Sequence, residues 1–276
     1  MRFVHFLEGS TKGLAIEKAG ALRGLTEQES GYPGALESLL KAGPNALQAA
    51  HQRLSDARLL DPSKLRYLPP LERPGKIVCV GLNYADHTKE SPYEQPTYPT
   101  FFPRFSTSLI GHGEPILRPR VSEQLDYEGE LAVVIGTGGR HIARAQALEH
   151  VAGYAIFNEA SVRDYQFKSP QWTIGKNFDA TGAFGPTFVS ADELPAGAVG
   201  LNLVTRLNGT VVQQGNTADM IFGVAELIAV LSEAVTLEPG DVIVTGTPAG
   251  IGWARRPPLF MKPGDLCTVE IEGLGT

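Results

Sequence analysis

Cysteine is scarce in this sequence, where Cys79 and Cys267 are the only two among 276 residues. Two cysteines cannot build a disulfide framework or a cysteine-based zinc site, and Cys79 lies in an apolar run where a small buried residue is expected. No apolar stretch approaches the roughly 20 residues of a membrane span, and the N-terminus lacks the apolar core of a signal peptide. These absences predict a cytoplasmic protein with no membrane partner.

Positive charge is also in short supply. The 24 Lys and Arg residues are outnumbered by 30 Asp and Glu residues, which gives a net charge of −6. A chain with this charge is not expected to bind nucleic acid or an anionic membrane surface. Glycine and proline are frequent instead, at 31 and 20 residues. They predict short elements joined by many turns and argue against a bundle of long helices.

The first 70 residues differ in pattern from the rest of the chain. Two β-like runs, at 2–7 and 13–17, precede helical patterns at 34–42 and 46–56. Together they predict a small α+β domain at the N-terminus.

A Pro-rich stretch at 68–75 marks the predicted end of this domain, because it cannot continue either periodicity. We interpret it as a semi-rigid linker that divides the chain into residues 1–70 and 71–276. The second region is predicted to be mainly β, with one packed helix at 220–233 where apolar residues recur at helical spacing. Runs rich in Val, Ile and Phe predict its strands at 77–81, 129–136, 151–157, 184–189, 201–206, 241–245 and 266–271.

The segment from Asp126 to Gly136 gives the strongest chemical signal. Side chains two residues apart in a strand point to the same face, so Glu128 and Glu130 direct two carboxylates to one spot. Such a pair suits a hard divalent cation such as Mg²⁺, Mn²⁺ or Ca²⁺; the alternative is a solvated strand edge. Glu159, which follows an apolar run, is a third oxygen ligand if the two strands are neighbours, and otherwise belongs to a helix cap.

Three further segments contain groups that can bind or activate a substrate. His87 and Glu90 share a face of a short helical turn, where the carboxylate fixes the imidazole as a general base; a surface pair is the alternative. Lys176 can polarise a substrate oxygen or flank the surface. The turn at 245–252, which includes Thr247, can offer backbone N–H groups to a carboxylate or be a simple tight turn. It matches neither a phosphate-binding loop nor a dinucleotide fingerprint.

Taken in order, these segments resemble the fumarylacetoacetate hydrolase superfamily from about residue 76 to the C-terminus. Five blocks carry the resemblance: Val80-Gly81-Leu82-Asn83-Tyr84-Ala85-Asp86-His87, Asp126-Tyr127-Glu128-Gly129-Glu130-Leu131, Ser161-Val162-Arg163-Asp164-Tyr165-Gln166, Gly175-Lys176-Asn177-Phe178-Asp179, and Leu237-Glu238-Pro239-Gly240-Asp241 with Thr245-Gly246-Thr247-Pro248. Residues 1–70 are similar, more loosely, to the small N-terminal domain of some bacterial members.

This resemblance implies an α+β, mainly β fold: a mixed β-sandwich roll of the family's C-terminal domain type, with a small α+β N-terminal domain. Members usually form homodimers and carry Mg²⁺ or Mn²⁺, with Ca²⁺ as an alternative. By matching positions, the resemblance assigns Glu128, Glu130 and Glu159 as metal ligands, His87, Glu90 and Lys176 as catalytic residues with the His87–Glu90 pair on a mobile lid, and Arg163, Gln166 and Thr247 as substrate-binding residues.

One position departs from the family pattern. Members usually have Asn-Asp where this chain has Asn158-Glu159, a ligand longer by one methylene, so either the ion must shift or the strand must back away. Further pocket walls are expected from Tyr84, Phe102, Arg104, Phe167 and Trp172. The extra cation among them suggests a second carboxylate or a polar tail on the substrate.

The activity that the resemblance implies is metal-dependent hydrolysis of a C–C bond in an acylpyruvate or related β-diketo acid, in the catabolism of aromatic compounds or sugar acids. His87, oriented by Glu90, would deprotonate the attacking water, and Lys176 would stabilise the departing enolate. Decarboxylation, isomerisation or hydration of a 2-oxo acid are the alternatives within the superfamily. A catalytically silent metal-binding protein is the alternative from another class. The chain lacks the fingerprint and the βαβ pattern of a dinucleotide-dependent oxidoreductase.

Overall fold

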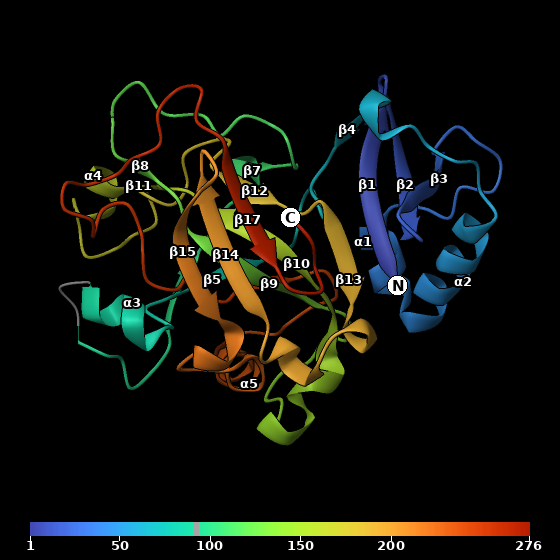
Figure 1. The fold of residues 1–276 in the computed structure, drawn as a ribbon. Helices are drawn as coiled ribbons and strands as arrows, with labels where there is room; N and C mark the ends of the chain where they lie inside the picture. Colours follow the sequence, from blue (N-terminus) through green and yellow to red (C-terminus); the bar gives the residue numbers. More distant parts are fainter. Residues whose placement is uncertain (91–93) are drawn as a thin grey trace.

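Residues 1–67 form a small α+β unit in the structure, a computed structural model that describes residues 1–90 and 94–276 (Figure 1). The elements of this unit are β1 (Arg2–Glu8), β2 (Thr11–Lys18), β3 (Ala21–Thr26), α1 (Leu36–Ala42), α2 (Pro44–Ser55) and β4 (Leu65–Tyr67). Both predicted β runs and both predicted helices are confirmed, whereas β3 was not predicted. Its burial alternates along the strand, but Arg23 and Gly24 interrupt the apolar run that would have revealed it.

The helices of this unit pack on its sheet through apolar residues at helical spacing. Leu39 and Leu40 of α1 and Leu54 of α2 are buried in one cluster with Phe3 of β1. Gly43 joins the two helices with a φ of 94°, a conformation that favours glycine, and Pro44 then begins α2, where a missing N–H costs nothing. The chain therefore reverses sharply enough for both helices to cover the same face.

The rest of the chain is mainly β. Its elements are β5 (Ile77–Gly81), α3 (Ala85–Glu90), β6 (Thr100–Pro103), β7 (Leu109–Ile110), β8 (Leu125–Asp126), β9 (Gly129–Ile135), β10 (Val151–Glu159), β11 (Ser161–Val162), α4 (Arg163–Gln166), β12 (Gly182–Phe184), β13 (Thr187–Ser190), β14 (Asn202–Leu207), β15 (Thr210–Asn216), α5 (Val224–Ala234), β16 (Val242–Val244) and β17 (Cys267–Ile271). The main sheet has the order β3-β2-β1-β13-β10-β9-β16-β5-β6, and β15-β14-β17 form a second sheet that lies over β9 and β10 (Figure 1). This mixed β-sandwich with few helices is the predicted fold class.

The strand β9 lies at the centre of the sandwich, and all seven of its residues are buried. Leu131, Val133 and Ile135 face the second sheet and α5, in a cluster that includes Leu203. Ala132 and Val134 face the opposite cluster, which extends to the N-terminal helices. Since side chains alternate along a strand, one strand supplies both cores.

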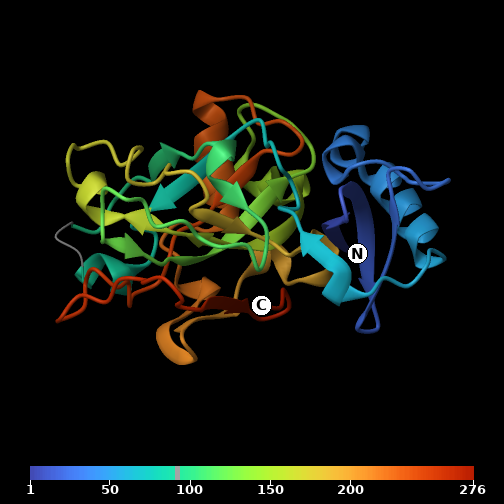
Figure 2. The ribbon, with the colours of Figure 1, turned by 90° about the horizontal axis from the view of Figure 1, so that it is seen from above.

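The N-terminal sheet continues into the main sheet. β1 pairs antiparallel with β13, which places Phe3 opposite Phe188, and Figure 2 shows the N-terminal unit at one end of the molecule. The Pro-rich stretch at 68–75 packs against both parts instead of forming a spacer, because Leu71 is fully buried and His5 Nδ1 lies 3.0 Å from the carbonyl oxygen of Pro69. The domain division at residue 70 stays a prediction.

Several predicted elements have different bounds. The run at 184–189 is two strands, β12 and β13, because Gly185 and Pro186 separate them, and the helix predicted from residue 220 begins at Val224. The strands β6 and β15 were not predicted, since β6 ends in a proline and β15 is rich in polar residues. No helix in the described residues is long and apolar enough to cross a membrane.

The side chain of Asn83 connects three elements of the mainly β region. Its side-chain Nδ2 donates to the carbonyl oxygens of Phe222 (3.0 Å) and Thr245 (2.8 Å), and its Oδ1 accepts from the N–H of Phe222 (2.8 Å). The end of β5, the end of β16 and the start of α5 are therefore held together by one fully buried amide.

Replacing Asn83 by alanine should lower the free energy of unfolding by roughly 3 kcal/mol, because three buried backbone groups lose their partner. Urea denaturation measures the change. Asn202→Ala serves as the matched control, since Asn202 is exposed and its loss should change stability by less than about 0.5 kcal/mol. Equal losses in the two variants would show that the Asn83 amide does not hold this junction.

Candidate active site

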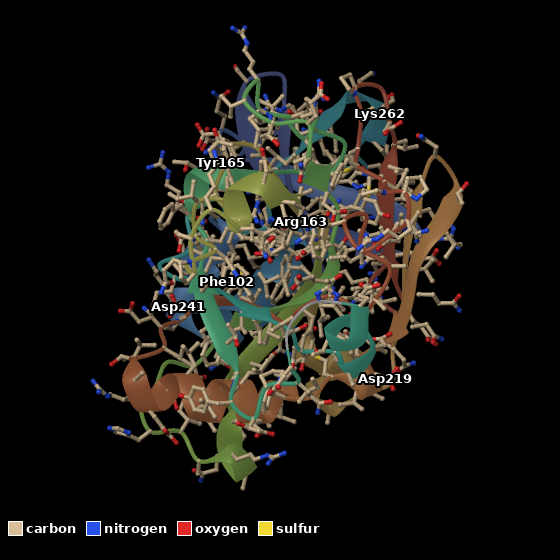
Figure 3. The ribbon with its side chains drawn as sticks, turned by 90° about the vertical axis from the view of Figure 1, so that its left-hand side faces the viewer. Phe102, Arg163, Tyr165, Asp219, Asp241 and Lys262 are labelled. Atoms are coloured by element: carbon tan, nitrogen blue, oxygen red, sulfur yellow. The ribbon has the colours of Figure 1, made fainter. Side chains whose placement is uncertain are left out.

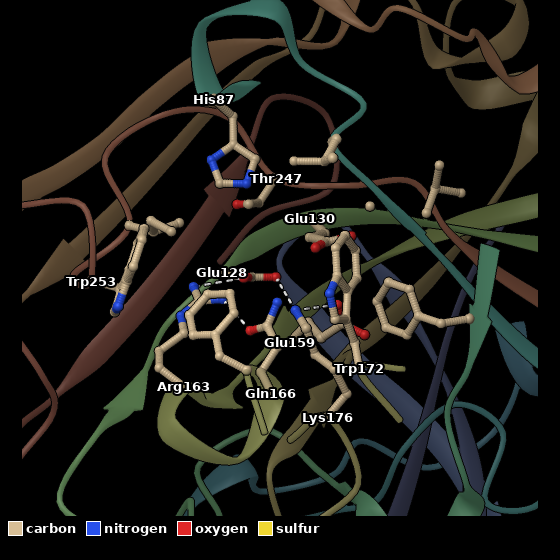
Figure 4. A pocket seen from close by; sticks show the side chains of 16 residues that line it. His87, Glu128, Glu130, Glu159, Arg163, Gln166, Trp172, Lys176, Thr247 and Trp253 are labelled. Atoms are coloured by element: carbon tan, nitrogen blue, oxygen red, sulfur yellow. Dashed lines mark hydrogen bonds and ion pairs between the residues drawn. The ribbon is translucent and has the colours of Figure 1, made fainter. Parts of the chain in front are cut away.

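The three glutamates predicted as metal ligands meet at one end of two adjacent strands. Phe157 of β10 is opposite Glu130 of β9, and the N–H of Glu159 donates to the carbonyl oxygen of Glu128 at 2.8 Å. In this register the side chains of residues 128, 130 and 159 point to the same face of the sheet. All three are buried, and one carboxylate oxygen from each lies within 4.8 Å of the others (Figure 4). The strand adjacency that the sequence left open is therefore present.

Two buried cations bind Glu128. Lys176 Nζ lies 2.7 Å from Glu128 Oε2 and 3.0 Å from Glu159 Oε2, and Arg163 Nη2 lies 2.7 Å from Glu128 Oε1. Burial alone would raise the pKa of Glu128, but Lys176 and Arg163 outweigh it and hold that pKa well below its usual value. Burial alone would lower the pKa of Lys176, but the two carboxylates raise it, so its amine stays protonated. The pair therefore remains charged at neutral pH.

Glu130 is in the opposite situation. Within the described part of the chain no lysine or arginine forms an ion pair with it, and one backbone N–H, that of Gly246, donates to its Oε2 at 2.6 Å. Burial, followed by the nearby carboxylates of Glu159 and Glu128, raises the pKa of Glu130 well above its usual value. If all three glutamates were ionised, the charge on Glu130 would therefore be the one that no ion pair among the described residues neutralises.

His87 lies across the pocket from the glutamates, on α3 (Figure 4). Its Nδ1 is 3.0 Å from Glu90 Oε1, so the predicted pair exists, and Glu90 is fixed in turn because the N–H of Gly250 donates to both of its oxygens at 3.0 Å. With Nδ1 engaged, the other ring nitrogen, Nε2, is the one left to exchange a proton with a substrate. Glu90 thus orients the imidazole toward the cluster.

Arg163 and Gln166 come from the single turn of α4 and are both buried beside the cluster. Figure 3 shows Arg163 near the middle of the molecule. The Arg163 Nη1 donates to Gln166 Oε1 at 2.8 Å, so the Gln166 amide oxygen is engaged and its nitrogen can act as a donor. Both residues line the pocket, as do Lys176 and Thr247.

The hydroxyl of Thr247 is hydrogen-bonded to other residues of the protein. Its Oγ1 donates to the carbonyl oxygen of Gly129 at 3.0 Å and accepts from Gln213 Nε2 at 2.8 Å, while Gln213 Oε1 accepts from the N–H of Gly129 at 2.9 Å. The two side chains therefore clamp the residue between Glu128 and Glu130. Gln213 was not predicted, because β15 is rich in polar residues and was itself not predicted as a strand.

Two residues predicted to bind substrate lie outside the pocket lining. The Arg104 side chain is fully buried behind Glu159, where its Nε donates to Ser108 Oγ (3.0 Å), its Nη2 donates to Thr181 Oγ1 (2.7 Å) and its Nη1 is 3.5 Å from Glu159 Oε1. Tyr84 is also buried, and its hydroxyl has no hydrogen-bond partner among the described residues. Burial raises the pKa of the Tyr84 phenol. Neither side chain lines the pocket.

The predicted aromatic walls do line the pocket: Phe102, Phe167 and Trp172 surround it together with Trp253. Trp172 lies against Gly81 so closely that a Cβ on Gly81 would be 2.1 Å from its ring, so this approach requires glycine. The Phe167 and Trp253 rings are 5.0 Å apart. The pocket therefore has a charged floor and apolar, aromatic walls.

The family model of the fumarylacetoacetate (FAA) hydrolase C-terminal domain matches residues 76–276. The chain belongs to the fumarylacetoacetate hydrolase family. All five blocks of the predicted resemblance lie within the matched range.

Relatives of this family match the whole chain. The human mitochondrial oxaloacetate tautomerase FAHD2A is 40% identical over 282 residues, which cover 100% of this chain and 90% of the relative. A fumarylacetoacetate hydrolase from psychrophilic Exiguobacterium antarcticum has a TM-score of 0.87 at 36% identity and covers 100% of this chain and 96% of its own. A 2-hydroxyhepta-2,4-diene-1,7-dioate isomerase from Mycobacterium marinum has a TM-score of 0.75 at 30% identity, with coverages of 100% and 95%. The relatives therefore include enzymes of more than one reaction, one of which is named as mitochondrial, so the cytoplasmic location stays a prediction.

The divalent cation that membership of the fumarylacetoacetate hydrolase family implies fits these residues. Glu159 Oε1 is buried and accepts no hydrogen bond from the described residues, and Glu130 has no cationic partner among them. Carboxylate oxygens are the ligands that hard divalent ions prefer. Glu159 reaches the cluster although it is longer than the usual aspartate, so the departure from the family pattern does not remove the third carboxylate.

Glu130→Gln should stabilise the metal-free protein and abolish its response to a divalent ion. With its raised pKa, Glu130 favours the folded state while protonated, and this stability is lost as pH rises from about 4.5 through the raised value. At pH 8 the variant should melt at least about 2 °C above the wild type in EDTA, since about 1 kcal/mol corresponds to that shift in a chain of this size.

Thermal unfolding measured in EDTA and in MnCl₂ tests this prediction. The wild type should melt at a higher temperature with Mn²⁺, and the variant should not. A variant that melts lower than the wild type in EDTA would mean that the Glu130 carboxylate is not under repulsion.

Proposed function

We propose that this protein is a metal-dependent enzyme that transfers a proton between the keto and enol forms of a small 2-oxo acid of the oxaloacetate type. The observation that carries the proposal is the position of His87, oriented by Glu90, across a narrow pocket from three convergent carboxylates. A base facing a cation site is what enolisation next to a 2-oxo group requires. The name of the human relative, an oxaloacetate tautomerase, supports the same reaction.

Glu128, Glu130 and Glu159 would hold the cation, for which Mg²⁺ and Mn²⁺ are the proposed ions because the donors are all carboxylate oxygens. When bound, such an ion polarises the 2-oxo group of a substrate and stabilises negative charge on its oxygen.

His87 is placed to move the proton. Its Nε2 would take a proton from the carbon next to the 2-oxo group, so that the electron pair of the C–H bond forms the C=C bond of the enol. Glu90, hydrogen-bonded to Nδ1 at 3.0 Å, stabilises the imidazolium that results. The imidazolium then returns the proton to the substrate oxygen, which completes the tautomerisation without any other reactant.

Lys176 and Gln166 would bind the substrate's oxygens. The Lys176 ammonium is held at the pocket floor by Glu128 and Glu159, where it adds positive charge beside the developing negative charge. The Gln166 amide nitrogen is a neutral donor on the neighbouring side. Phe102, Trp172 and Trp253 restrict water at the walls, which strengthens these contacts.

Hydrolytic cleavage of an acylpyruvate C–C bond is the second candidate. The His87–Glu90 pair favours it, since an imidazole oriented by a carboxylate can equally take a proton from water. The name of the Exiguobacterium structure supports it as well. A homodimer acting on a small-molecule substrate, without nucleic acid or membrane, remains our proposal for the working form.

His87→Ala should lower the Mn²⁺-dependent rate of oxaloacetate enol–keto conversion by about 10²- to 10⁴-fold, which is the usual contribution of a general base. The decay of the enol's ultraviolet absorbance, corrected for the uncatalysed rate, measures it. His150→Ala is the control, because the half-buried His150 ring contacts the carbonyl oxygen of Thr137 and does not line the pocket.

The same two variants are assayed on an acylpyruvate. Wild-type turnover of the acylpyruvate without any acceleration of enol–keto conversion would replace the main proposal by the second candidate. An unchanged rate in His87→Ala on both substrates would exclude both mechanisms.

A further inference from the structure

We infer that Asp126 is a positioning residue that couples the two halves of this site, the glutamate cluster and the His87–Glu90 pair. The inference rests on the proposed function only in treating Glu128 as a ligand of the cation. One buried carboxylate, which the sequence did not single out, connects to both halves through its hydrogen-bond partners, and the last link to Glu128 is an ion pair. The position of Asp126 in the sequence is the signal that could have revealed it, because the acidic residues 126, 128 and 130 occupy every second position.

Asp126 is fully buried, and both of its carboxylate oxygens accept hydrogen bonds. Its Oδ1 accepts from the N–H groups of Tyr127 (2.8 Å) and Gly252 (2.7 Å), and its Oδ2 accepts from Arg163 Nε (2.8 Å) and the N–H of Trp253 (2.9 Å). A carboxylate offers about four lone-pair directions, and here four donors occupy them. Asp126 therefore cannot serve as a fourth ligand for a cation, and its role must pass through its partners.

Arg163 connects Asp126 to the glutamate cluster. The Arg163 guanidinium is planar, so the bond from its Nε to Asp126 sets the direction of the other nitrogens. In that orientation Nη2 is 2.7 Å from Glu128 Oε1, while Lys176 occupies Glu128 Oε2. Asp126 thus determines how Glu128 presents its carboxylate.

Gly252 and Trp253 connect Asp126 to the His87–Glu90 pair. Gly252 and Trp253 belong to the same short loop as Gly250, whose N–H donates to both oxygens of Glu90. At Gly252 a Cβ would be 1.8 Å from the carbonyl oxygen of Leu259 and 2.7 Å from Asp126 Oδ1, so the loop approaches Asp126 only because this residue is glycine. Asp126 therefore also fixes the backbone group that holds Glu90.

Asp126→Asn tests the coupling with almost no change in volume. All four partners of Asp126 are donors, so the remaining amide oxygen of Asn can accept on only one side. The new NH₂ group then sets donor against donor on the other side, whether that side is Arg163 and Trp253 or Gly252 and Tyr127. We expect Mn²⁺ binding to weaken by about 10- to 100-fold, the usual effect of losing the partner of a ligand. We also expect faster amide hydrogen exchange in both 250–253 and 85–90 of the metal-free protein.

Asp164→Asn is the matched control, because Asp164 is the neighbouring acid on α4 and contacts Ser122 outside the pocket. It should change neither the Mn²⁺ affinity nor the exchange of the two segments. Calorimetry and exchange need no turnover, so a protein inactive on oxaloacetate would still test this inference. Wild-type Mn²⁺ affinity in Asp126→Asn, or faster exchange confined to 250–253, would overturn it.

A second variant perturbs the network from its other end, in case Asp126→Asn does not fold. Gly252→Ala leaves every charged group in place but pushes the loop away from Asp126. Coupling predicts that it, too, weakens Mn²⁺ binding at least about tenfold although residue 252 touches none of the three glutamates. Unchanged affinity together with faster exchange at 250–253 would show that the loop and the cluster are independent.

Discussion

The mutual repulsion of three buried carboxylates is the constraint on which the rest of this structure depends. Glu128, Glu130 and Glu159 converge almost fully buried at the floor of the pocket, and in such surroundings like charges strongly disfavour a common ionised state. Lys176, Arg163 and Arg104 lie around them, but Arg163 also pairs with Asp126, and Glu130 gains no cation of its own among the described residues. A divalent ion held by the three carboxylates would resolve this imbalance, which would explain why a fold retains such a costly arrangement.

The sheet supplies the precision that this cluster needs. Central strands buried on both faces cannot slip by one residue without moving apolar side chains out of two cores, so the register that brings Glu130 opposite Phe157 is strongly fixed. The His87–Glu90 pair is attached differently, through a short helix held by Gly250 at one end and by the Asn83 junction at the other. The floor and the base are therefore held by different elements, and Asp126 links the two through Arg163 and the loop at 250–253.

Sequence reasoning predicted the parts of the site that follow from local periodicity. Alternation along a strand is enough to pair Glu128 with Glu130, and helical spacing is enough to pair His87 with Glu90. It could not predict contacts made across long separations. Arg104 looked like a pocket wall because its partner, Glu159, is 55 residues away in sequence, and Gln213 and Asp126 became visible only when β15 and the loop at 250–253 were placed beside β9. For the same reason, composition could not show that Leu71 in the Pro-rich stretch is buried.

Calorimetric titration of the metal-free protein with Mn²⁺ tests most directly whether Glu128, Glu130 and Glu159 form one cation site. Titrations in two buffers of different ionisation enthalpy measure the protons released. We expect one Mn²⁺ per chain, with proton release that increases as the pH is lowered from 8, because the pKa of Glu130 is raised. Absence of saturable binding, or binding with no proton release at any pH, would contradict this expectation.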